Sequence, residues 1–378
     1  MIKLVNLRKQ YLNNKIVIDK NIKKVIKSNN FIMGPEVREL ESELTKVTKS
    51  KFCLTVSSGT DALLISLMSI NIKAGDEVIV PGFTYISPVE AILRLGATPI
   101  FIDVYKDSGN INTSLIERKI TKKTKAIFFV NLYGNLCNID HLKEIKKRNK
   151  TIRFIEDGAQ SLGATYKSFN SGNTLDISCT SFFPTKTLGC YGDGGAIFTN
   201  QKKIYDKAKM IREHGQKIKY HHDLIGVGGR LDTIQAAILL AKLKKFKKEI
   251  ILRKDNYEYY EKLFNKINQN IEKRNQIERF KFSTKGLPNY ASYNILVKPT
   301  LRSKLISYLH KINIPTTIYY PKIITEHKPY KKFALLNNLK NSKFISRRVL
   351  SLPFDPYLEK KKIVFIVGEI SKFILKNR

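Results

Sequence analysis

The sequence predicts an α/β protein with a large, mainly parallel sheet and a smaller α/β domain at the C-terminal end. Three observations lead to this prediction. Helix-like and strand-like patterns alternate between residues 37 and 200, polar side chains follow several expected strands, and one long helical pattern separates this region from the rest. A chain of 378 residues is long enough for two domains, which we expect at 1–250 and 251–378.

Short apolar runs predict the strands of the large sheet, and segments with an apolar period near 3.6 residues predict the helices between them. The expected strands are 52–56, 77–80, 99–104, 126–130 and 152–155, and the expected helices are 36–49, 61–69, 88–95 and 141–148. This alternation is typical of βαβ units, in which helices cover both faces of a parallel sheet. Ligands of such sheets bind beyond the carboxyl ends of the strands.

The second half of the chain begins with a glycine-rich turn at 192–195, which we expect to lead into a strand at 196–199. A continuous helical pattern from residue 231 to about residue 263 is expected to connect the two domains. Beyond it, we expect strands at 290–297 and 315–320 and helices at 300–311 and 359–375. These elements make up the smaller domain.

The formal net charge of +36 raises the question of a nucleic-acid partner. Nucleic-acid binders concentrate positive charge on one face and use arginine for paired contacts, whereas here lysine predominates and is spread along the chain. Abundant Lys, Asn and Ile together with the absence of Trp indicate an AT-rich coding sequence. We therefore expect no nucleic-acid partner, although the charge would attract small anions such as sugar nucleotides.

Neither a membrane segment nor a metal site is expected. No apolar run approaches the roughly 18 residues that cross a membrane, and the N-terminus lacks a signal-peptide core, so we expect a cytoplasmic protein with no membrane partner. The cysteines form no Cys-x-x-Cys pair and no cluster with histidine, which favours buried thiols in a reducing compartment. They are Cys53, Cys137, Cys179 and Cys190, of which the last is close in sequence to Lys186.

Lys186 is the strongest catalytic candidate because of the residues around it. It lies in Ser-Phe-Phe-Pro-Thr-Lys-Thr-Leu-Gly at 181–189, just before the glycine-rich turn. Upstream, Asp157 follows the apolar strand at 152–155. A lysine amine can form a Schiff base with the aldehyde of pyridoxal 5'-phosphate, and a buried aspartate can keep the pyridine nitrogen protonated. Together, Lys186 and Asp157 indicate a pyridoxal phosphate enzyme.

Other segments offer groups for the phosphate and the ring of that cofactor. Gly59 and Thr60 open a helix after a strand, where backbone N–H groups favour a phosphate, and Ser181 offers a hydroxyl. Tyr85 could stack on the ring, and Gln160 could reach its phenolic oxygen. Each segment has a purely structural alternative: a helix cap by Thr60 or Ser58 at the start of the helix, a turn cap for Ser181, a core aromatic for Tyr85 and a surface helix residue for Gln160. No nucleotide-binding glycine motif is present.

Taken together, these segments resemble the DegT/DnrJ/StrS family of sugar-nucleotide aminotransferases, within the aspartate-aminotransferase fold (fold type I). The resemblance covers nearly the whole chain, at 31–37, 57–63, 81–85, 156–164, 181–195, 212–215, 226–243 and 350–353. It implies that Lys186 carries the Schiff base, that Asp157 contacts the pyridine nitrogen, and that Gln160 contacts the phenolic oxygen. It further implies that Tyr85 stacks on the ring and that Gly59, Thr60 and Ser181 hold the phosphate.

Two longer stretches, 221–243 and 314–322, are most similar to enzymes that aminate C3 of UDP-2-acetamido-2-deoxy-3-oxo-glucuronate for surface polysaccharides such as the lipopolysaccharide O-antigen. The resemblance implies a homodimer with a shared site, in which Arg230 of one chain reaches the other, and it implies that Tyr320 contacts the substrate. Two positions depart from the family pattern. Gly228, followed by Gly229, stands where Asn is usual, and Thr325 stands where His is usual.

The expected reaction is a transfer of an amino group from an amino-acid donor, which we expect to be glutamate, to a nucleotide-linked keto-sugar, with Lys186 as general acid–base. Lysine at this position favours amino transfer, because a dehydratase branch of the family has histidine there. A 4-keto-sugar linked to dTDP or UDP is the alternative substrate. A non-catalytic cofactor-binding protein or a nucleic-acid binder is the alternative from another class.

Overall fold

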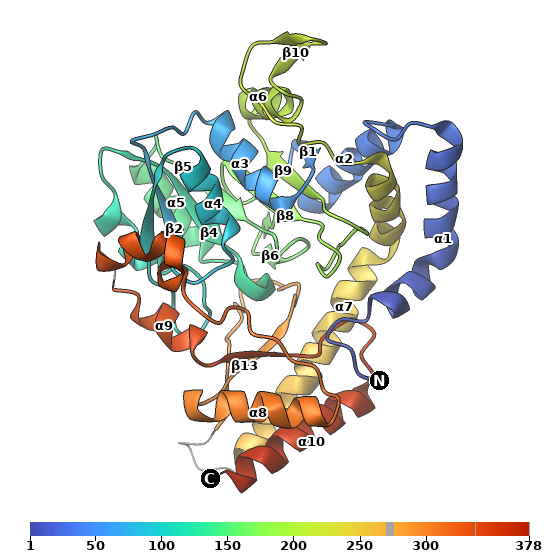
Figure 1. Ribbon diagram of the computed structural model, residues 1–378, viewed down its shortest axis with the longest axis vertical. Coiled ribbons are helices and arrows are strands. Elements are labelled where there is room, and N and C mark those ends of the chain that lie inside the picture. Colours follow the sequence, from blue (N-terminus) through green and yellow to red (C-terminus); the bar gives the residue numbers. More distant parts are fainter. Residues whose placement is uncertain (270–275, 337, 378) are drawn as a thin grey trace.

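The computed structural model describes residues 1–269, 276–336 and 338–377, and its upper part in Figure 1 is a seven-stranded sheet flanked by helices. The strand order is β1-β9-β8-β5-β4-β2-β3. All neighbouring pairs are parallel except those of β9, which runs antiparallel to β1 and β8, so the predicted mainly parallel sheet is confirmed. The strands are β1 (Phe52–Val56), β2 (Glu77–Pro81), β3 (Thr98–Ile102), β4 (Thr124–Val130), β5 (Arg153–Asp157), β8 (Ile177–Ser181) and β9 (Gly195–Thr199).

The reversed strand β9 explains where the lysine loop lies. Gly195, the first residue of β9, pairs with Val56 and Ser181, the last residues of β1 and β8. The loop 182–194 therefore begins and ends at the edge of the sheet where the parallel strands finish. This is the edge at which ligands of parallel sheets bind.

The predicted helices of the large domain are all present, with ends within a few residues of those expected. Local sequence explains several of the ends: Ser58 caps α3 and Asn138 caps α5 through their side-chain oxygens, and Pro35 opens α2. The helices and 3-10 turns of this part are α1 (Leu7–Ser28), α2 (Pro35–Thr48), α3 (Gly59–Ser69), α4 (Ser87–Arg94), η1 (Thr113–Leu115), η2 (Glu117–Lys119), η3 (Leu132–Gly134), α5 (Ile139–Arg148) and α6 (Lys202–Arg212).

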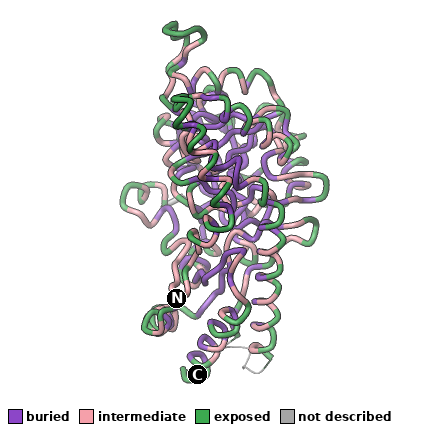
Figure 2. The backbone as a smooth tube through the Cα atoms, turned by 90° about the vertical axis from the view of Figure 1, so that its right-hand side faces the viewer, coloured by how far each residue is buried: buried purple, intermediate pink, exposed green. Residues whose placement is uncertain are grey.

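The core of the large part lies around the central strands, where Figure 2 shows the buried backbone concentrated. Val78 and Val80 of β2 and Ala126 and Phe128 of β4 are fully buried in one apolar cluster with α3 and α4. Ile79 and Ile127, the alternate residues of the same strands, are buried in a second cluster with α5. Both faces of these strands are thus covered, as expected for a parallel sheet.

The long helix α7 (Thr233–Gln269) connects the two parts of the chain (Figure 1). Its first half packs in the large part through Phe246 and Ile250, and its second half packs in the C-terminal part through Tyr260 and Phe264. The boundary that we expect at residue 250 falls inside this helix and remains a prediction. The C-terminal elements are β12 (Glu278–Arg279), β13 (Tyr293–Leu296), α8 (Pro299–Lys311), η5 (Ile324–Glu326), η6 (Lys328–Leu336), α9 (Lys340–Ser346), β14 (Val349–Leu352) and α10 (Lys360–Lys376).

One predicted strand is wrong. The segment 315–320 is not a strand, because only Thr317 pairs with a neighbour, in an isolated bridge to Ser351. After this bridge the chain leaves the small sheet and turns toward the large part, where the Tyr319 carbonyl oxygen accepts a hydrogen bond from Tyr133. The expected strand at 290–297 is shorter, Tyr293–Leu296.

Several elements were not predicted, among them α1, β8 and β14. The buried face of α1 includes Gln10 and Asn14 among apolar residues, which hides its apolar period. Strand β8 has the sequence Ile-Ser-Cys-Thr-Ser, which is too polar to read as a buried strand, and β14 was likewise missed. In both α1 and β8, neighbouring parts of the fold supply partners for the buried polar groups, and this cannot be read from local sequence.

Two short hairpins complete the described structure: β6 (Thr165–Tyr166) with β7 (Phe169–Asn170), and β10 (Gln216–Ile218) with β11 (His221–His222). The second hairpin projects from the top of the molecule and is exposed along its length (Figures 1 and 2). Among the described residues, no helix is long and apolar enough to cross a membrane.

Candidate active site

The predicted site residues gather at the carboxyl edge of the large sheet. Asp157 is the last residue of β5, and Ser181 is the last residue of β8. Gly59 opens α3 three residues after the end of β1, and Tyr85 follows the end of β2 by four residues. Lys186 lies in the loop between β8 and β9. One edge therefore brings together residues that are far apart in the sequence, such as Gly59 and Lys186, which are 127 residues apart.

Asp157 and Lys186 influence each other electrostatically. Burial raises the pKa of Asp157, while the Ala159 N–H, which donates to Oδ1 at 3.1 Å, and the charge of Lys186 act in the opposite direction. Desolvation lowers the pKa of Lys186, and the carboxylate of Asp157 opposes this shift. The two groups form no direct ion pair among the described residues, so each remains available to a ligand.

The N-terminus of α3 has free backbone donors. The Ser58 hydroxyl accepts from the Asp61 N–H at 3.0 Å, which makes Ser58 the helix cap and confirms that structural alternative for this residue. The N–H groups of Gly59 and Thr60 precede the first intrahelical bond and have no acceptor among the described residues. They therefore point to an anion at this helix end.

Close packing and hydroxyl contacts fix the surroundings of this helix end. A Cβ on Gly59 would lie 2.7 Å from the Cβ of Ser181, so glycine is required where α3 meets the end of β8. The Ser181 hydroxyl accepts from the Phe183 N–H at 3.2 Å, and the Thr60 hydroxyl lies 2.8 Å from that of Ser87. Both hydroxyls retain the capacity for a further hydrogen bond.

Gln160 joins two parts of the site. Its Oε1 accepts from the Tyr133 N–H at 2.8 Å, and its Nε2 donates to the Tyr320 hydroxyl at 3.1 Å. The ring of Tyr320 lies 5.8 Å from that of Tyr85, which is about half exposed. Gln160 is thus part of a hydrogen-bond network rather than a free surface residue, and Tyr85 presents an open aromatic face.

The segment before α7 also reaches this edge. The Gly229 carbonyl accepts from the Ser57 N–H at 2.9 Å, next to the N-terminus of α3. A Cβ on Gly228 would lie 3.0 Å from the ring of His214, which fills the space that a larger side chain would need. Arg230 is half-buried and forms no hydrogen bond or ion pair with any residue that the structure describes. Thr325, the other departure, is buried in η5.

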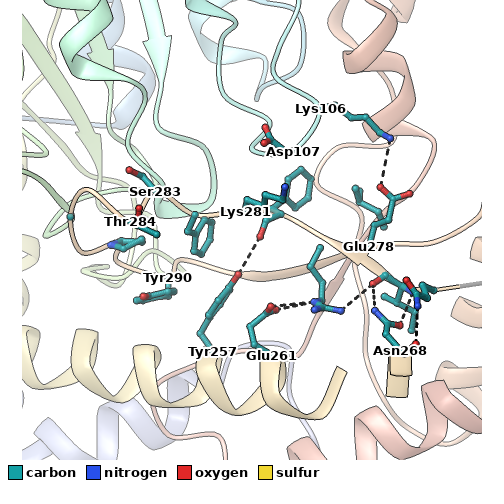
Figure 3. A pocket seen from close by; sticks show the side chains of 18 residues that line it. Lys106, Asp107, Tyr257, Glu261, Asn268, Glu278, Lys281, Ser283, Thr284 and Tyr290 are labelled. Atoms are coloured by element: carbon teal, nitrogen blue, oxygen red, sulfur yellow. Dashed lines mark hydrogen bonds and ion pairs between the residues drawn. The ribbon is translucent and has the colours of Figure 1, made fainter. Parts of the chain in front are cut away.

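Two cavities help to delimit the site. A cavity of about 10 Å³, the volume of roughly one water, lies at Lys186 and is also lined by Gln10, Arg253 and Tyr357. A much larger one, about 1050 Å³, lies between α7 and the segment 276–290 (Figure 3). No predicted site residue lines the larger cavity, and four of its charged side chains form two ion pairs, Lys106–Glu278 and Arg279–Glu261. We assign the larger cavity no role in the site.

Sequence reasoning missed several residues of the site. Tyr133 follows β4 at the same sheet edge, and this position after a strand was the available signal. Gln235 and Lys242 of α7 contact the loop that carries Lys186, and their sequence gave no signal of this. All four cysteines are buried and free, and Cys190 donates to backbone carbonyl oxygens, as expected for structural thiols. Within the described residues, no group of three or more potential ligands could hold a metal ion.

The arrangement fits pyridoxal phosphate. Lys186 Nζ and Asp157 Oδ2 form no hydrogen bond with any described residue, which leaves an amine and a carboxylate oxygen for the cofactor. The N–H groups of Gly59 and Thr60 are free to bind its phosphate. Tyr85 would supply a face for the ring. These individual contacts remain predictions.

Comparisons with known proteins agree with this fit. Residues 14–371 match the model of the DegT/DnrJ/EryC1/StrS aminotransferase family. The chain is 38% identical over 371 residues (98% of this chain, 100% of the relative) to the UDP-2-acetamido-2-deoxy-3-oxo-D-glucuronate aminotransferase of Pseudomonas aeruginosa. It is 33% identical to the UDP-N-acetyl-3-dehydro-α-D-glucosamine 3-aminotransferase of Acidithiobacillus ferrooxidans (98% and 97% covered).

A solved structure supports both fold and cofactor. NtdA from Bacillus subtilis, crystallised with the cofactor PMP, is 27% identical with a TM-score of 0.88 and covers 96% of this chain and 82% of its own. PMP is the aminated form of pyridoxal phosphate. The expectation of fold type I is therefore confirmed. The chain belongs to the DegT/DnrJ/EryC1/StrS aminotransferase family and is a pyridoxal phosphate-dependent aminotransferase.

Proposed function

We propose that this sugar-nucleotide aminotransferase moves an amino group from glutamate to C3 of UDP-2-acetamido-2-deoxy-3-oxo-glucuronate. The observation that carries the proposal is the electrostatic coupling of Lys186 and Asp157 at the sheet edge, in a chain whose full length is similar to an enzyme named for this substrate. The product would supply an amino sugar for a surface polysaccharide, and the reaction would take place in the cytoplasm.

Pyridoxal phosphate supplies a ring that withdraws electrons from the Cα–H bond of the amino donor. The residues of this chain would transfer protons and orient the cofactor. Lys186 would move the proton between the donor Cα and C4′ of the cofactor, because burial lowers the pKa of Lys186 and so favours the neutral amine, which is the form that acts as a base. Asp157 holds the proton on the pyridine nitrogen, and Gln160 orients the phenolic oxygen.

The charge of the proposed acceptor supports this choice of substrate. A UDP-linked glucuronate carries negative charge on both the diphosphate and the sugar carboxylate. Arg230 is a half-buried guanidinium with no partner among the described residues, and its planar fork suits a carboxylate or a phosphate. The net charge of +36 adds a long-range attraction for such an anion. A dTDP-linked 4-keto-sugar lacks the sugar carboxylate and would offer Arg230 only its diphosphate.

The proposal includes a homodimer with a shared site. Around the segment 226–243, large apolar side chains are exposed: Tyr220 and Ile225 are 77% and 88% exposed, and Phe31 and Ile32 are also exposed. Exposed apolar side chains mark protein interfaces where they form a contiguous patch. A second copy of the chain seated here would cover them and bring a second Arg230 to the region.

The experiment that tests the substrate runs the reaction in reverse from the stable 3-amino sugar. The enzyme, loaded with pyridoxal phosphate, receives UDP-2,3-diamino-2,3-dideoxy-glucuronate in its 2-N-acetyl form together with 2-oxoglutarate, and glutamate formation is measured. We expect kcat/KM to exceed that for dTDP-linked 4-amino sugars by at least about tenfold, the scale of one lost charged contact. A preference for a 4-amino sugar would support the alternative substrate and overturn the proposal.

A further inference from the structure

Lys242 is a buried lysine for which the proposed reaction gives no role. Only 2% of its surface is exposed, although it lies on α7 among lysines that face solvent. Its Nζ donates a hydrogen bond to the Gly189 carbonyl oxygen and lies 5.2 Å from the centre of the Tyr191 ring. Both contacts are to the loop that carries Lys186.

A second residue of α7 holds the same loop. Gln235 Oε1 accepts from the Tyr191 N–H at 2.8 Å, and its Nε2 donates to the Tyr191 carbonyl at 3.4 Å. Gln235 and Lys242 are seven residues apart, so they lie two turns apart on one face of the helix. Between them, Leu239 is buried in the same apolar cluster as Leu188. One face of α7 therefore supports the loop at three successive levels.

The loop folds back on itself, so that holding Gly189 in place also limits the movement of Lys186. A Cβ on Gly189 would lie 2.6 Å from the carbonyl oxygens of Phe183 and Pro184. The Cys190 N–H donates to the Phe182 carbonyl at 2.8 Å, and the Lys186 N–H donates to the Phe183 carbonyl at 2.9 Å. A movement of Gly189 would therefore shift both ends of the turn in which Lys186 lies.

The charge of Lys242 is retained at neutral pH. Burial lowers its pKa to about 8, while Glu249 and the Cys190 thiol favour the charged form and Arg253 opposes it. Glu249, one of these neighbours, also accepts from Gln10 and Tyr357. Below pH 8 the ammonium is the donor to the Gly189 carbonyl, and hydrogen bonds from charged donors are about twice as strong as neutral ones.

We propose that Lys242 is a positioning residue that, together with Gln235, anchors the loop 186–191 to α7 and so fixes the place of the Lys186 amine. The proposal rests on the assignment of Lys186 as the reacting lysine. Lys242 itself touches neither cofactor nor substrate. Its contribution is to keep the turn 182–190 closed while the Lys186 side chain changes from binding the cofactor to transferring the proton.

Amide hydrogen exchange of the cofactor-free protein tests the anchoring directly. The variants are Lys242→Met, which keeps the length and removes the ammonium, Lys242→Gln, which keeps a neutral N–H donor, and Gln235→Ala. Lys244→Met, at an exposed position of the same helix, is the matched control. We expect the amides of 182–191 to exchange at least about tenfold faster in Lys242→Met, with the central strand β4 unchanged, as for a local opening. In Lys242→Gln, the exchange rate of these amides should lie between that of Lys242→Met and that of the wild type.

Kinetics of the loaded enzyme give the second measurement. We expect kcat to fall about tenfold in Lys242→Met while KM for both substrates changes less than about twofold, because positioning acts after binding. If loop exchange and kcat of Lys242→Met equal those of Lys244→Met, the proposal is overturned. If Lys242→Met does not fold, the loop exchange and kcat of Lys242→Gln and Gln235→Ala are compared with those of Lys244→Met, and equal values overturn the proposal. A loosened loop in a protein that aminates no UDP-sugar would refute the proposed substrate and leave the anchoring role standing.

Discussion

Gln160 and Tyr320 are joined by a hydrogen bond of 3.1 Å, which links the residues after β5 to a segment that follows α8. The contact spans 160 residues of sequence and brings a side chain from the C-terminal part to the edge of the large sheet. Burial raises the pKa of the Tyr320 phenol far above its ordinary value, with the nearby Asp157 charge adding to the shift, so Tyr320 stays neutral and acts as a hydrogen-bonding group.

Tyr320→Phe should raise KM for the sugar nucleotide roughly threefold to tenfold, the equivalent of one neutral hydrogen bond, and should leave KM for glutamate nearly unchanged. Tyr319→Phe is the matched control, because Tyr319 contacts Tyr133 through its backbone carbonyl. Steady-state kinetics of both variants with each substrate varied provide the measurement. An equal rise in both KM values would show that the hydroxyl supports the site as a whole and does not contact the sugar.

Asp157→Asn should slow proton transfer by about 100-fold, which corresponds to about 2.7 kcal/mol of transition-state stabilisation. A neutral amide cannot hold the pyridine nitrogen protonated, so the ring withdraws electrons less well. Single-turnover absorbance changes on mixing with glutamate measure this step without the sugar. Cofactor should still bind, and a rate equal to that of the wild type would remove Asp157 from the mechanism.

Mixing Lys186→Ala chains with Arg230→Ala chains should restore part of the activity that each variant lacks alone. In a mixed dimer, one of the two sites would combine an intact Lys186 with an intact Arg230 from the partner. Full statistical mixing predicts up to about a quarter of the wild-type activity, since half of the dimers are mixed and each has one intact site. Activity that stays at the level of the separate variants would argue against a site shared in this way.

Lys242 also gives a pH dependence of stability with a defined sign. Its pKa is lowered from 10.5 to about 8, mainly by burial. Below about pH 8 the group is charged in both states, and the cost of burying the charge is present in full. Between about 8 and 10.5 the unfolded chain binds the proton and the folded chain does not, so folding stability rises with pH by up to about 3 kcal/mol.

The wild type should therefore gain stability relative to Lys242→Met as the pH rises from 7 to 10. Denaturant unfolding of both proteins across this range gives the difference, and the other titrating groups cancel between them. Glu249, Arg253, Cys190 and Tyr191 face the amine and remain the same in both. A difference that does not change with pH would mean that the buried amine keeps an ordinary pKa.

Local sequence was enough to predict six of the seven strands of the large sheet, all but β8, and the edge at which the site lies. Strands such as β2 and β4 are continuous apolar runs because both of their faces are covered, and Asp157 stands out as an acid at the end of such a run. The role of Lys186 as the reacting lysine was predicted from its loop and from family resemblance, whereas its place at this edge comes from the pairing of β8 with β9. The apolar strands and the acid at the end of β5 can be recognised from the few residues around each of them.

Features set by contacts between distant segments could not be predicted. Lys242 is one lysine among many, and only the packing of α7 against the loop at 189 buries it. The segment 315–320 has residues typical of a strand, yet most of its length leaves the small sheet to reach the site. Gln10 and Asn14 hid α1 because Glu249 and the helix backbone satisfy them only in the folded chain.

The most direct test of the account is to fix the cofactor covalently to the lysine that holds it. Borohydride reduces a Schiff base between pyridoxal phosphate and a lysine to a stable secondary amine, which mass spectrometry of the digested protein locates. We predict that the loaded wild-type enzyme carries the label on Lys186 and that Lys186→Ala carries none. Label on a different lysine in the wild type, or equal labelling of Lys186→Ala, would contradict the central claim.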